Sequence, residues 1–193
     1  MPLRRTLTKR QRVTLISAIV ALIVVTAQHI GLIKTAQNNL EKSQPGLYTV
    51  VGFSDGDTIT VDMNGKKEKI RFIGVDTPET HKPNAPVQCY GPAASAFTKN
   101  FIGNKQVRLE SDALSTNRDR YDRLLRYVYL PDGTLVNQRL IEGGFGFYYP
   151  YFPFEKSDKF DQAQQKARSE NKGLWGNCKP AQTDSGGWIS NNL

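Results

Sequence analysis

The sequence predicts an α+β domain built on a small closed β-barrel with about three helices, preceded by a hydrophobic helix. Five short segments rich in β-branched or alternating apolar residues predict strands. One helical pattern lies between the third and fourth of these segments, and two more follow the fifth. With 193 residues, the chain is long enough for one domain with a substantial core plus accessory segments.

The first 45 residues differ in composition from the rest of the chain. Residues 1–12 form a basic flank, 13–33 are an uncharged and mainly apolar run, and 34–45 are polar and predict a linker. The apolar run is about as long as a helix must be to cross a hydrocarbon core of ~30 Å. A basic flank before such a run stays in the cytoplasm, so export of the remaining chain is predicted. An uncleaved anchor and a signal peptide cut after Ala27 both remain open. A buried core helix would not explain the charge asymmetry.

The net charge says little about the partner. It is formally +8, but six of the 26 basic residues lie before residue 35, and no acidic residue precedes Glu41. From residue 35 onward, 20 basic and 18 acidic residues nearly balance. The positive excess therefore belongs mostly to the amino-terminal segment and does not by itself indicate a nucleic-acid partner.

The first three strands are predicted at 47–53, 58–61 and 69–75. Asn64-Gly65 joins the last two and is typical of a type I′ hairpin turn, in which both central residues have positive φ. Three prolines then predict an irregular exposed loop at 81–87.

Helices are predicted where apolar residues recur at helical spacing. The first, 91–102, begins with Gly-Pro and stops before Gly103, and the longest, 154–171, is amphipathic. The other elements are strands at 105–110 and 124–130 and a short helix at 136–142. Ser, Asn and Gly are frequent in 179–193, which predicts a disordered tail and leaves Trp188 there unexplained.

Four carboxylates and an arginine fall within the predicted hairpin region 54–79: Asp55, Asp57, Arg71, Asp76 and Glu79. The hairpin carries two acidic clusters, Asp55 with Asp57 and Asp76 with Glu79, towards one end. Like charges placed together repel unless a cation or a guanidinium offsets them, and carboxylate oxygens suit Ca²⁺ or Mg²⁺. Each cluster alone could be a turn or a helix start, but the two together with the arginine indicate a site.

Arg71 has two interpretations. An arginine within a strand commonly pairs with a cross-strand acid, here Asp62. To join the acidic site it must converge with Asp76, although simple alternation sends the two to opposite faces. Convergence requires a twist or bulge, for which Gly74 is the natural place.

Two motifs of the hairpin, DGDT and IRFIGVDTPE, closely resemble the staphylococcal nuclease (thermonuclease) family. The likeness continues through CYGPAASAFTKNFI (89–102), DRYDRLLRYVYLPDGTLVNQRLIEGGFG (119–146) and KGLWGNC (172–178). It covers roughly residues 47–178 and implies a five-stranded OB-fold barrel over 46–178. This fold handles single-stranded chains through one face and its loops.

Matched residue by residue, the resemblance implies a calcium site and a catalytic set. The implied metal ligands are Asp57, Asp76 and the backbone carbonyl of Thr77, with Asp55 as a supporting acid. The implied catalytic residues are Arg71 and Arg123, which bind phosphate, and Glu79, which orients water. Arginine suits phosphate because its planar guanidinium binds in a bidentate manner.

Aromatic residues near these positions are candidates for substrate contact, because bases stack on aromatic rings without regard to sequence. We assign this role to Tyr121, Tyr149 and Tyr151. The sequence departs from the family pattern at two positions. Asp122 replaces a glycine before Arg123, where aspartate tolerates a left-handed backbone. Ala93 replaces a common acidic residue.

The two cysteines, Cys89 and Cys178, both fall within the likeness. In an exported protein such a pair is expected to be bridged, which contributes on the order of 4–5 kcal/mol in the chain-entropy model. Two separate buried thiols are the alternative. Neither cysteine has the spacing to a histidine that a zinc site requires.

The resemblance implies a Ca²⁺-dependent nuclease that hydrolyses DNA and RNA, prefers single strands and leaves 3′-phosphates. We expect it to act as a monomer outside the cytoplasm, tethered to the membrane or secreted. One alternative is a binding module that kept the barrel without catalysis, and another is a structural or adhesive anchor domain. Neither needs all five of the matched acids and arginines, so the enzyme is favoured.

Overall fold

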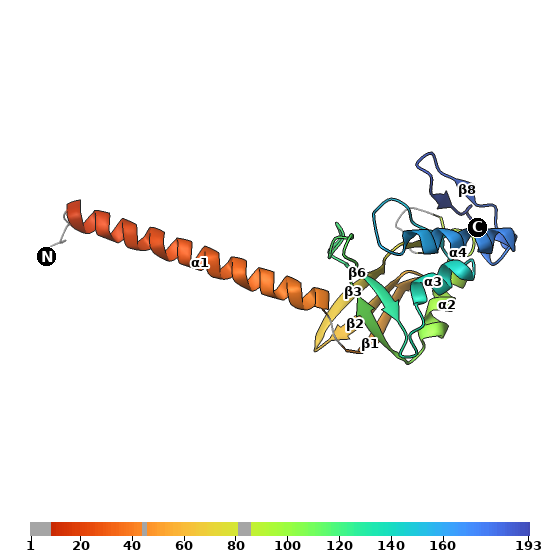
Figure 1. Cartoon of the computed structure of the whole chain (residues 1–193), viewed down its shortest axis with the longest axis horizontal. Coiled ribbons are helices and arrows are strands. Elements are labelled where there is room, and N and C mark those ends of the chain that lie inside the picture. Colours follow the sequence, from red (N-terminus) through yellow and green to blue (C-terminus); the bar gives the residue numbers. More distant parts are fainter. Residues whose placement is uncertain (1–8, 44–45, 81–85) are drawn as a thin grey trace. The chain divides into compact units, whose positions relative to one another are not determined.

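The computed structural model describes residues 9–43, 46–80 and 86–193 (Figure 1). Most of the predicted basic flank, residues 44–45 of the predicted linker and most of the predicted 81–87 loop lie outside the described residues. The chain divides after Lys42 into two compact units, and the second contains the whole barrel domain.

Helix α1 spans Lys9–Ser43 and contains the predicted apolar run. Within it, Thr14–Ile33 is long and apolar enough to cross a membrane, a test that a signal sequence near an amino terminus also passes. The predicted linker is helical over 34–43. This stretch contains good helix formers such as Ala, Gln, Leu, Glu and Lys, and its first proline comes only at position 45.

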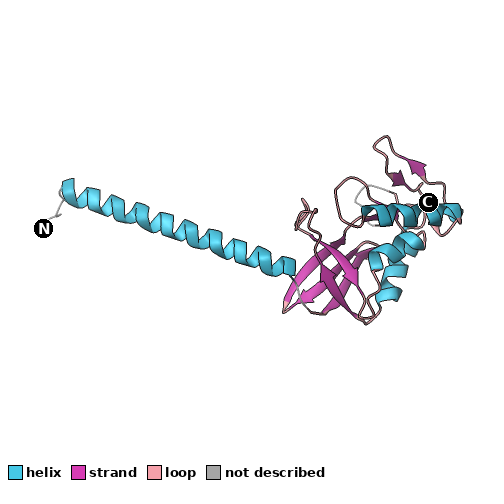
Figure 2. Cartoon of the chain, viewed as in Figure 1, coloured by secondary structure: helices cyan, strands magenta, loops and turns pink. Residues whose placement is uncertain are grey.

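Five strands form a closed barrel in the order β1-β2-β3-β6-β5 (Figure 2). They are β1 (Tyr48–Asp55), β2 (Thr58–Met63), β3 (Lys66–Phe72), β5 (Gln106–Glu110) and β6 (Leu124–Tyr129). Neighbouring strands are antiparallel except β3 and β6, which pair in parallel. The predicted five-stranded OB-fold barrel is therefore confirmed. Asn64 and Gly65 both have positive φ, as the predicted hairpin turn requires.

The domain helices lie along one side of the barrel (Figure 2). They are α2 (Gly91–Ile102), α3 (Val136–Glu142), α4 (Ser157–Ser169) and the short α5 (Leu174–Asn177). Alternate barrel residues such as Ile59, Val61 and Ile70 are fully buried and share one core with Leu140 of α3 and Phe160 of α4. Burying apolar surface from both strands and helices is the main stabilising term of this fold.

The chain bends sharply after β3, at Ile73-Gly74. Gly74 has a φ of +72°, and a Cβ added there would lie 2.5 Å from Cζ of Phe154. Buried Asn137 of α3 supports the bend, since its side-chain amide donates to the carbonyls of Ile73 (3.0 Å) and Arg126 (3.2 Å). After the bend, β4 (Val75–Asp76) pairs with β7 (Phe147–Tyr148) instead of continuing in the barrel. The bend expected at Gly74 is present.

The prediction of a disordered tail is wrong. Residues after Cys178 form a hairpin of β8 (Ala181–Gln182) and β9 (Trp188–Ile189), in dark blue in Figure 1. Trp188 packs edge-to-face on Trp175 of α5, with ring centroids 5.1 Å apart, and the guanidinium of Arg168 lies 4.5 Å from its ring centroid. The polar composition misled the prediction because one tryptophan anchors the segment.

We predict that Gly74→Ala lowers the unfolding free energy by about 2–5 kcal/mol. A positive φ costs a non-glycine residue ~1–2 kcal/mol, and the added methyl group would overlap the ring of Phe154 at a further ~1–3 kcal/mol. Gly133→Ala is the matched control, because Gly133 has a φ of +84° but nothing within 4 Å of an added Cβ. Urea denaturation of both variants measures the difference. Equal losses would contradict the role of packing at the bend.

Candidate active site

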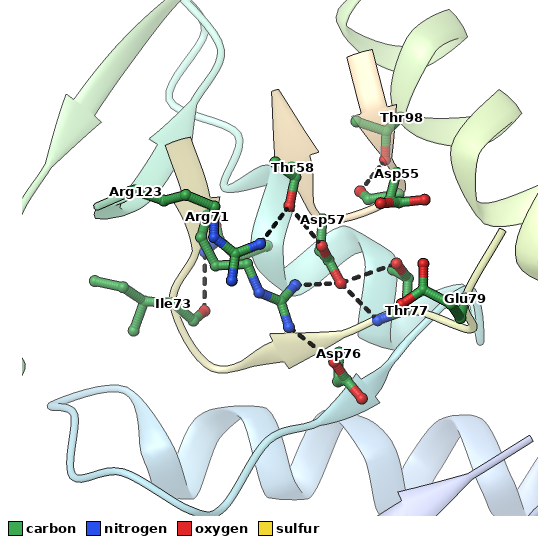
Figure 3. A network of polar contacts seen from close by, with 12 residues as sticks. Asp55, Asp57, Thr58, Arg71, Ile73, Asp76, Thr77, Glu79, Thr98 and Arg123 are labelled. Atoms are coloured by element: carbon green, nitrogen blue, oxygen red, sulfur yellow. Dashed lines mark hydrogen bonds and ion pairs between the residues drawn. The ribbon is translucent and has the colours of Figure 1, made fainter. Parts of the chain in front are cut away.

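A single guanidinium joins the two acidic clusters at one end of the β2–β3 hairpin (Figure 3). Arg71 pairs in register with Thr58, the residue after Asp57. Its Nη1 forms an ion pair with Oδ2 of Asp57, and its Nη2 donates to Oδ1 of Asp76 at 2.7 Å. Asp62, the other expected partner of Arg71, instead accepts a hydrogen bond from the amide of Gly65 at 2.7 Å. Asp62 is therefore not the partner of Arg71, which pairs with Asp57 and Asp76 instead.

Asp57 is the buried anchor of the site, with 6% of its surface exposed. Oδ2 accepts hydrogen bonds from the amide (2.8 Å) and the hydroxyl (2.9 Å) of Thr77, and Oδ1 accepts one from the Thr58 hydroxyl (2.9 Å). Burial raises the pKa of Asp57, but the charge of Arg71 and these hydrogen bonds outweigh it and hold the pKa below its usual value. The carboxyl is therefore ionised at neutral pH.

Asp76 has the opposite electrostatic balance. Its side chain is 42% exposed, and Arg71 is its ion-pair partner. Although this side chain is partly exposed, the protein around it removes part of its hydration and raises its pKa, and the negative charges of Asp57 and Glu79 add to this, so that together they outweigh Arg71. One guanidinium therefore does not fully compensate the acids around it, and the site favours additional positive charge.

Arg123 approaches the same centre from the loop before β6. Its Nε and Nη2 both lie 2.7 Å from Oδ2 of Asp119, which fixes the guanidinium plane. Its Nη1 lies 3.5 Å from the Thr58 hydroxyl, which in turn donates to Asp57. Asp122 has a φ of +64°, so the turn survives the replacement of the family's glycine. Both arginines thus reach Asp57, one directly and one through Thr58.

The two remaining acids lie on the segments that flank Asp57 and Asp76. Asp55 accepts a hydrogen bond from the Thr80 hydroxyl. Gln88 holds the backbone of Glu79 on both sides: its side-chain oxygen accepts from the Glu79 amide at 2.8 Å, and its own amide donates to the Glu79 carbonyl at 2.9 Å. The position of Glu79 therefore depends on the segment before α2.

All ten residues predicted for the metal, catalytic and substrate roles line one cleft of about 750 Å³. They are Asp55, Asp57, Arg71, Asp76, Thr77, Glu79, Tyr121, Arg123, Tyr149 and Tyr151. Tyr121 is 64% exposed at the rim, and the rings of Tyr149 and Tyr151 meet edge-to-face with centroids 4.7 Å apart. The structure brings the predicted set together without exception.

The cleft also contains residues that the sequence analysis missed. Lys69 lies two positions before Arg71 on the same strand, a spacing that places both on one face. Arg120 lines the cleft beside Tyr121, its Cζ 4.8 Å from the ring centroid. Four residues of the tail, Thr183, Trp188, Ile189 and Asn192, line it as well. The apolar pair Trp188-Ile189 within the polar tail was the sequence signal that this segment packs against the domain.

The other arginines near Arg123 have different surroundings. Arg118 forms an ion pair with Glu68 at 3.0 Å, and Arg126 is fully buried, donating to the side-chain oxygen of Asn117 at 2.8 Å. Neither lines the cleft, which leaves Arg120 and Arg123 as the cationic residues that this loop contributes to it.

Comparison with known proteins identifies this arrangement. The family model described as "Staphylococcal nuclease homologue" matches residues 69–177. The chain belongs to the staphylococcal nuclease family. It is 41% identical over 169 residues to the thermonuclease of Staphylococcus hyicus, which covers 84% of this chain and 96% of that protein. The thermonuclease of Staphylococcus intermedius is 40% identical, covering 81% and 92%.

A second group of relatives comes from another genus. Endonuclease YncB of Bacillus subtilis is 44% identical over 123 residues, covering 63% of this chain and 57% of that protein. These relatives are named as nucleases, and they support a nuclease, a phosphodiester hydrolase, as the activity of this family member.

The donor atoms of the site fit the calcium ion that the staphylococcal nuclease family implies. Asp57 and Asp76 lie within reach of a single cation, since one guanidinium bridges them. Across residues 9–43, 46–80 and 86–193, no three Asp, Glu, His or Cys side chains are grouped closely enough to hold a metal alone. Calcium would therefore also need carbonyl and water oxygens, both of which it commonly uses in proteins.

The structure also contains a disulfide between Cys89 and Cys178, which are 89 residues apart. It connects the segment just before α2 to the residue that follows α5. Gln88, the partner of the Glu79 backbone, directly precedes Cys89, so the bridge lies one residue from a segment that shapes the cleft.

We predict that Arg71→Met destabilises the metal-free domain by about 3–5 kcal/mol at pH 7.5, because Asp57 loses the cation that offsets its burial. The loss should be smaller at pH 4.5. Without Arg71 the pKa of the carboxyl pair rises above the unfolded value of about 3.9, so the folded state binds protons preferentially and gains stability as pH falls. Urea denaturation with chelator present at both pH values measures this.

Arg118→Met is the control, since Arg118 pairs with Glu68 away from the cleft, and Glu68 keeps a second partner in Lys66. A loss for Arg71→Met that is equal at both pH values would contradict the assigned charge balance.

Proposed function

We propose that this protein is a Ca²⁺-dependent nuclease of low sequence specificity that hydrolyses DNA and RNA, prefers single strands and leaves 3′-phosphates. The observation that carries the proposal is the bridge from Arg71 to Asp57 and Asp76 in a cleft that Arg123 and Glu79 also line. A protein that only bound nucleic acid would gain nothing from clustered acids, because they repel phosphate.

Arg71 and Arg123 would bind the phosphate. Nη1 of Arg71 is buried and ion-paired with Asp57, and its Nη2 donates to Asp76. Asp119 holds Arg123 through Nε and Nη2, and Nη1 makes only a long contact of 3.5 Å. Arg123 thus has an N–H group available for a phosphate oxygen, and Arg71 would add its positive charge beside it, where negative charge builds in the transition state.

Asp57, Asp76 and the carbonyl of Thr77 would hold calcium. Bound there, the ion would supply positive charge to the phosphate and orient the reactants. Glu79 would accept the proton of the attacking water. The water oxygen bonds to phosphorus as the bond from phosphorus to the 5′ oxygen breaks, and the departing 5′ oxygen takes a proton from solvent water, which leaves a 3′-phosphate and a 5′-hydroxyl. Tyr121, Tyr149 and Tyr151 would contact the neighbouring nucleotides.

We further propose that the nuclease domain acts outside the cytoplasm. The exposed apolar segment Thr14–Ile33 supports a membrane anchor or a signal peptide, and the Cys89–Cys178 pair supports an oxidising compartment.

We predict that the full chain, purified in detergent micelles, degrades single-stranded DNA with Ca²⁺ and stops when EGTA is added. Glu79→Gln and Arg123→Ala should each reduce kcat by about 10²–10⁴-fold, because one removes the proton acceptor and the other a phosphate ligand. Gel-based digestion with product-end analysis measures the rates and locates the phosphate.

Glu170→Gln and Arg139→Ala are matched controls, since both residues are charged surface residues of the domain helices or their ends and neither lines the cleft. Digestion that persists in EGTA would reject the metal assignment. Losses of only a few-fold in the two site variants would favour the nucleic-acid-binding module.

We predict that the chain expressed in a bacterium with a Sec pathway is recovered outside the cytoplasm with Cys89 linked to Cys178. Non-reducing mass spectrometry of the membrane and secreted fractions identifies the bridge and shows whether cleavage follows Ala27. Free thiols in the exported protein would reject the bridge, and recovery of the domain in the cytoplasm would reject export.

A further inference from the structure

The carboxy-terminal segment 181–193 lies beyond the residues matched by the family model, yet it contributes part of the cleft wall. Thr183, Trp188, Ile189 and Asn192 line the same cleft as Arg71 and Asp76. No role in the proposed reaction accounts for these side chains. The question is whether they only close the fold or also meet the substrate.

The segment is held in place at two sites that belong to the cleft. On one side, the Tyr151 hydroxyl lies 2.9 Å from the Thr183 hydroxyl and accepts a hydrogen bond from Ser185 at 3.0 Å. On the other side, the amide of Cys89 donates to the Asn191 carbonyl at 2.7 Å, and Gln88 forms an isolated antiparallel β-bridge with Asn192. The segment is therefore fixed both to Tyr151, a tyrosine of the cleft, and to Gln88, the residue that holds the Glu79 backbone.

Ile189 differs from its surroundings in this wall. Its side chain is 47% exposed, although Trp188 beside it is packed against Trp175 and Arg168. Most of the cleft near the acids is charged, and the exposed isoleucine adds apolar surface there. An exposed apolar side chain next to phosphate-binding arginines suits the face of a base or sugar, which is apolar, next to a phosphate, which is not.

The hydrogen bonds to Tyr151 also favour a substrate-binding surface on this wall. Because Thr183 and Ser185 occupy its hydroxyl, the ring is fixed and its 39% exposed surface is offered as an apolar face. A ring that is already fixed before the substrate binds loses less side-chain conformational entropy on binding.

From these contacts we propose that segment 181–193 forms a binding subsite for a nucleotide that flanks the cleaved bond, with Ile189 as its apolar contact and Tyr151 positioned by Thr183 and Ser185. The subsite takes an unpaired nucleotide of a single-stranded polynucleotide and thereby favours chains over single-nucleotide diesters. The inference rests on the proposed nuclease function and names a substrate preference of the same cleft.

The test compares two substrates on the full-length protein in detergent micelles with Ca²⁺. One is a single-stranded 12-residue oligothymidylate, and the other is a nitrophenyl phosphodiester of one thymidine. Ile189→Ser should lower the ratio of kcat/KM for the oligonucleotide to kcat/KM for the small diester about fivefold. Leu193→Ser is the matched control, because Leu193 is also a large exposed apolar residue of the segment but does not line the cleft. It should leave the ratio unchanged.

A purely structural role of the segment predicts the same loss on both substrates, so an unchanged ratio in Ile189→Ser would overturn the proposal. Binding of the fluorescently labelled oligonucleotide, measured by anisotropy with EGTA present, separates the two hypotheses. If the protein binds the oligonucleotide but cleaves neither substrate, the proposed function fails, and a fivefold weaker affinity in Ile189→Ser still supports the subsite. Equal affinity of Ile189→Ser and the unmodified protein, or no binding by either, would overturn it.

Discussion

The bridge from Arg71 to Asp57 and Asp76 is the interaction on which the rest of the site depends. Asp57 is 6% exposed and could not remain charged there without a cation and several hydrogen-bond donors. The guanidinium supplies that charge and fixes the distance between the two acidic segments. A fold that separated the three residues would leave Asp57 to protonate and Asp76 without its partner.

The barrel creates this contact by interrupting its own strand. If β3 continued, alternation would point Asp76 away from Arg71. Gly74 instead adopts a left-handed backbone, and Asn137 binds the carbonyl of Ile73 on the inner side of the bend. β4 then pairs with β7, which carries Phe147 and Tyr148 next to Tyr149. A single bend therefore places an acid beside the arginine and the aromatic segment beside the acid.

Short-range patterns predicted a small barrel and the acidic centre of the site, and the resemblance to the staphylococcal nuclease family supplied the OB topology and the role of Arg123. Alternation, the Asn-Gly turn and the clustered acids are all short-range signals, and Gly74 was the natural place for the bend. The missed features depend on contacts distant in sequence. Asp112, for example, is buried and accepts hydrogen bonds from Tyr127 and from the amide of Glu155, 43 residues away. The polar composition of the tail likewise gave no sign of its ordered structure, which depends on the packing of Trp188 on Trp175 and on backbone hydrogen bonds near Cys89.

Because the tail is folded, the cleft is built from the tail as well as from the barrel and the segments that follow it. The hairpin end supplies the charged centre, β7 and the residues after it supply tyrosines, and the last segment of the chain closes one wall. This last wall attaches beside Cys89, and the disulfide ties that point to the end of α5. Gln88 directly precedes Cys89 in the chain and holds the backbone of Glu79 through hydrogen bonds. A displacement of the tail would therefore reach Gln88 and, through it, the backbone of Glu79, so we expect the position of Glu79 to change with the shape of the cleft.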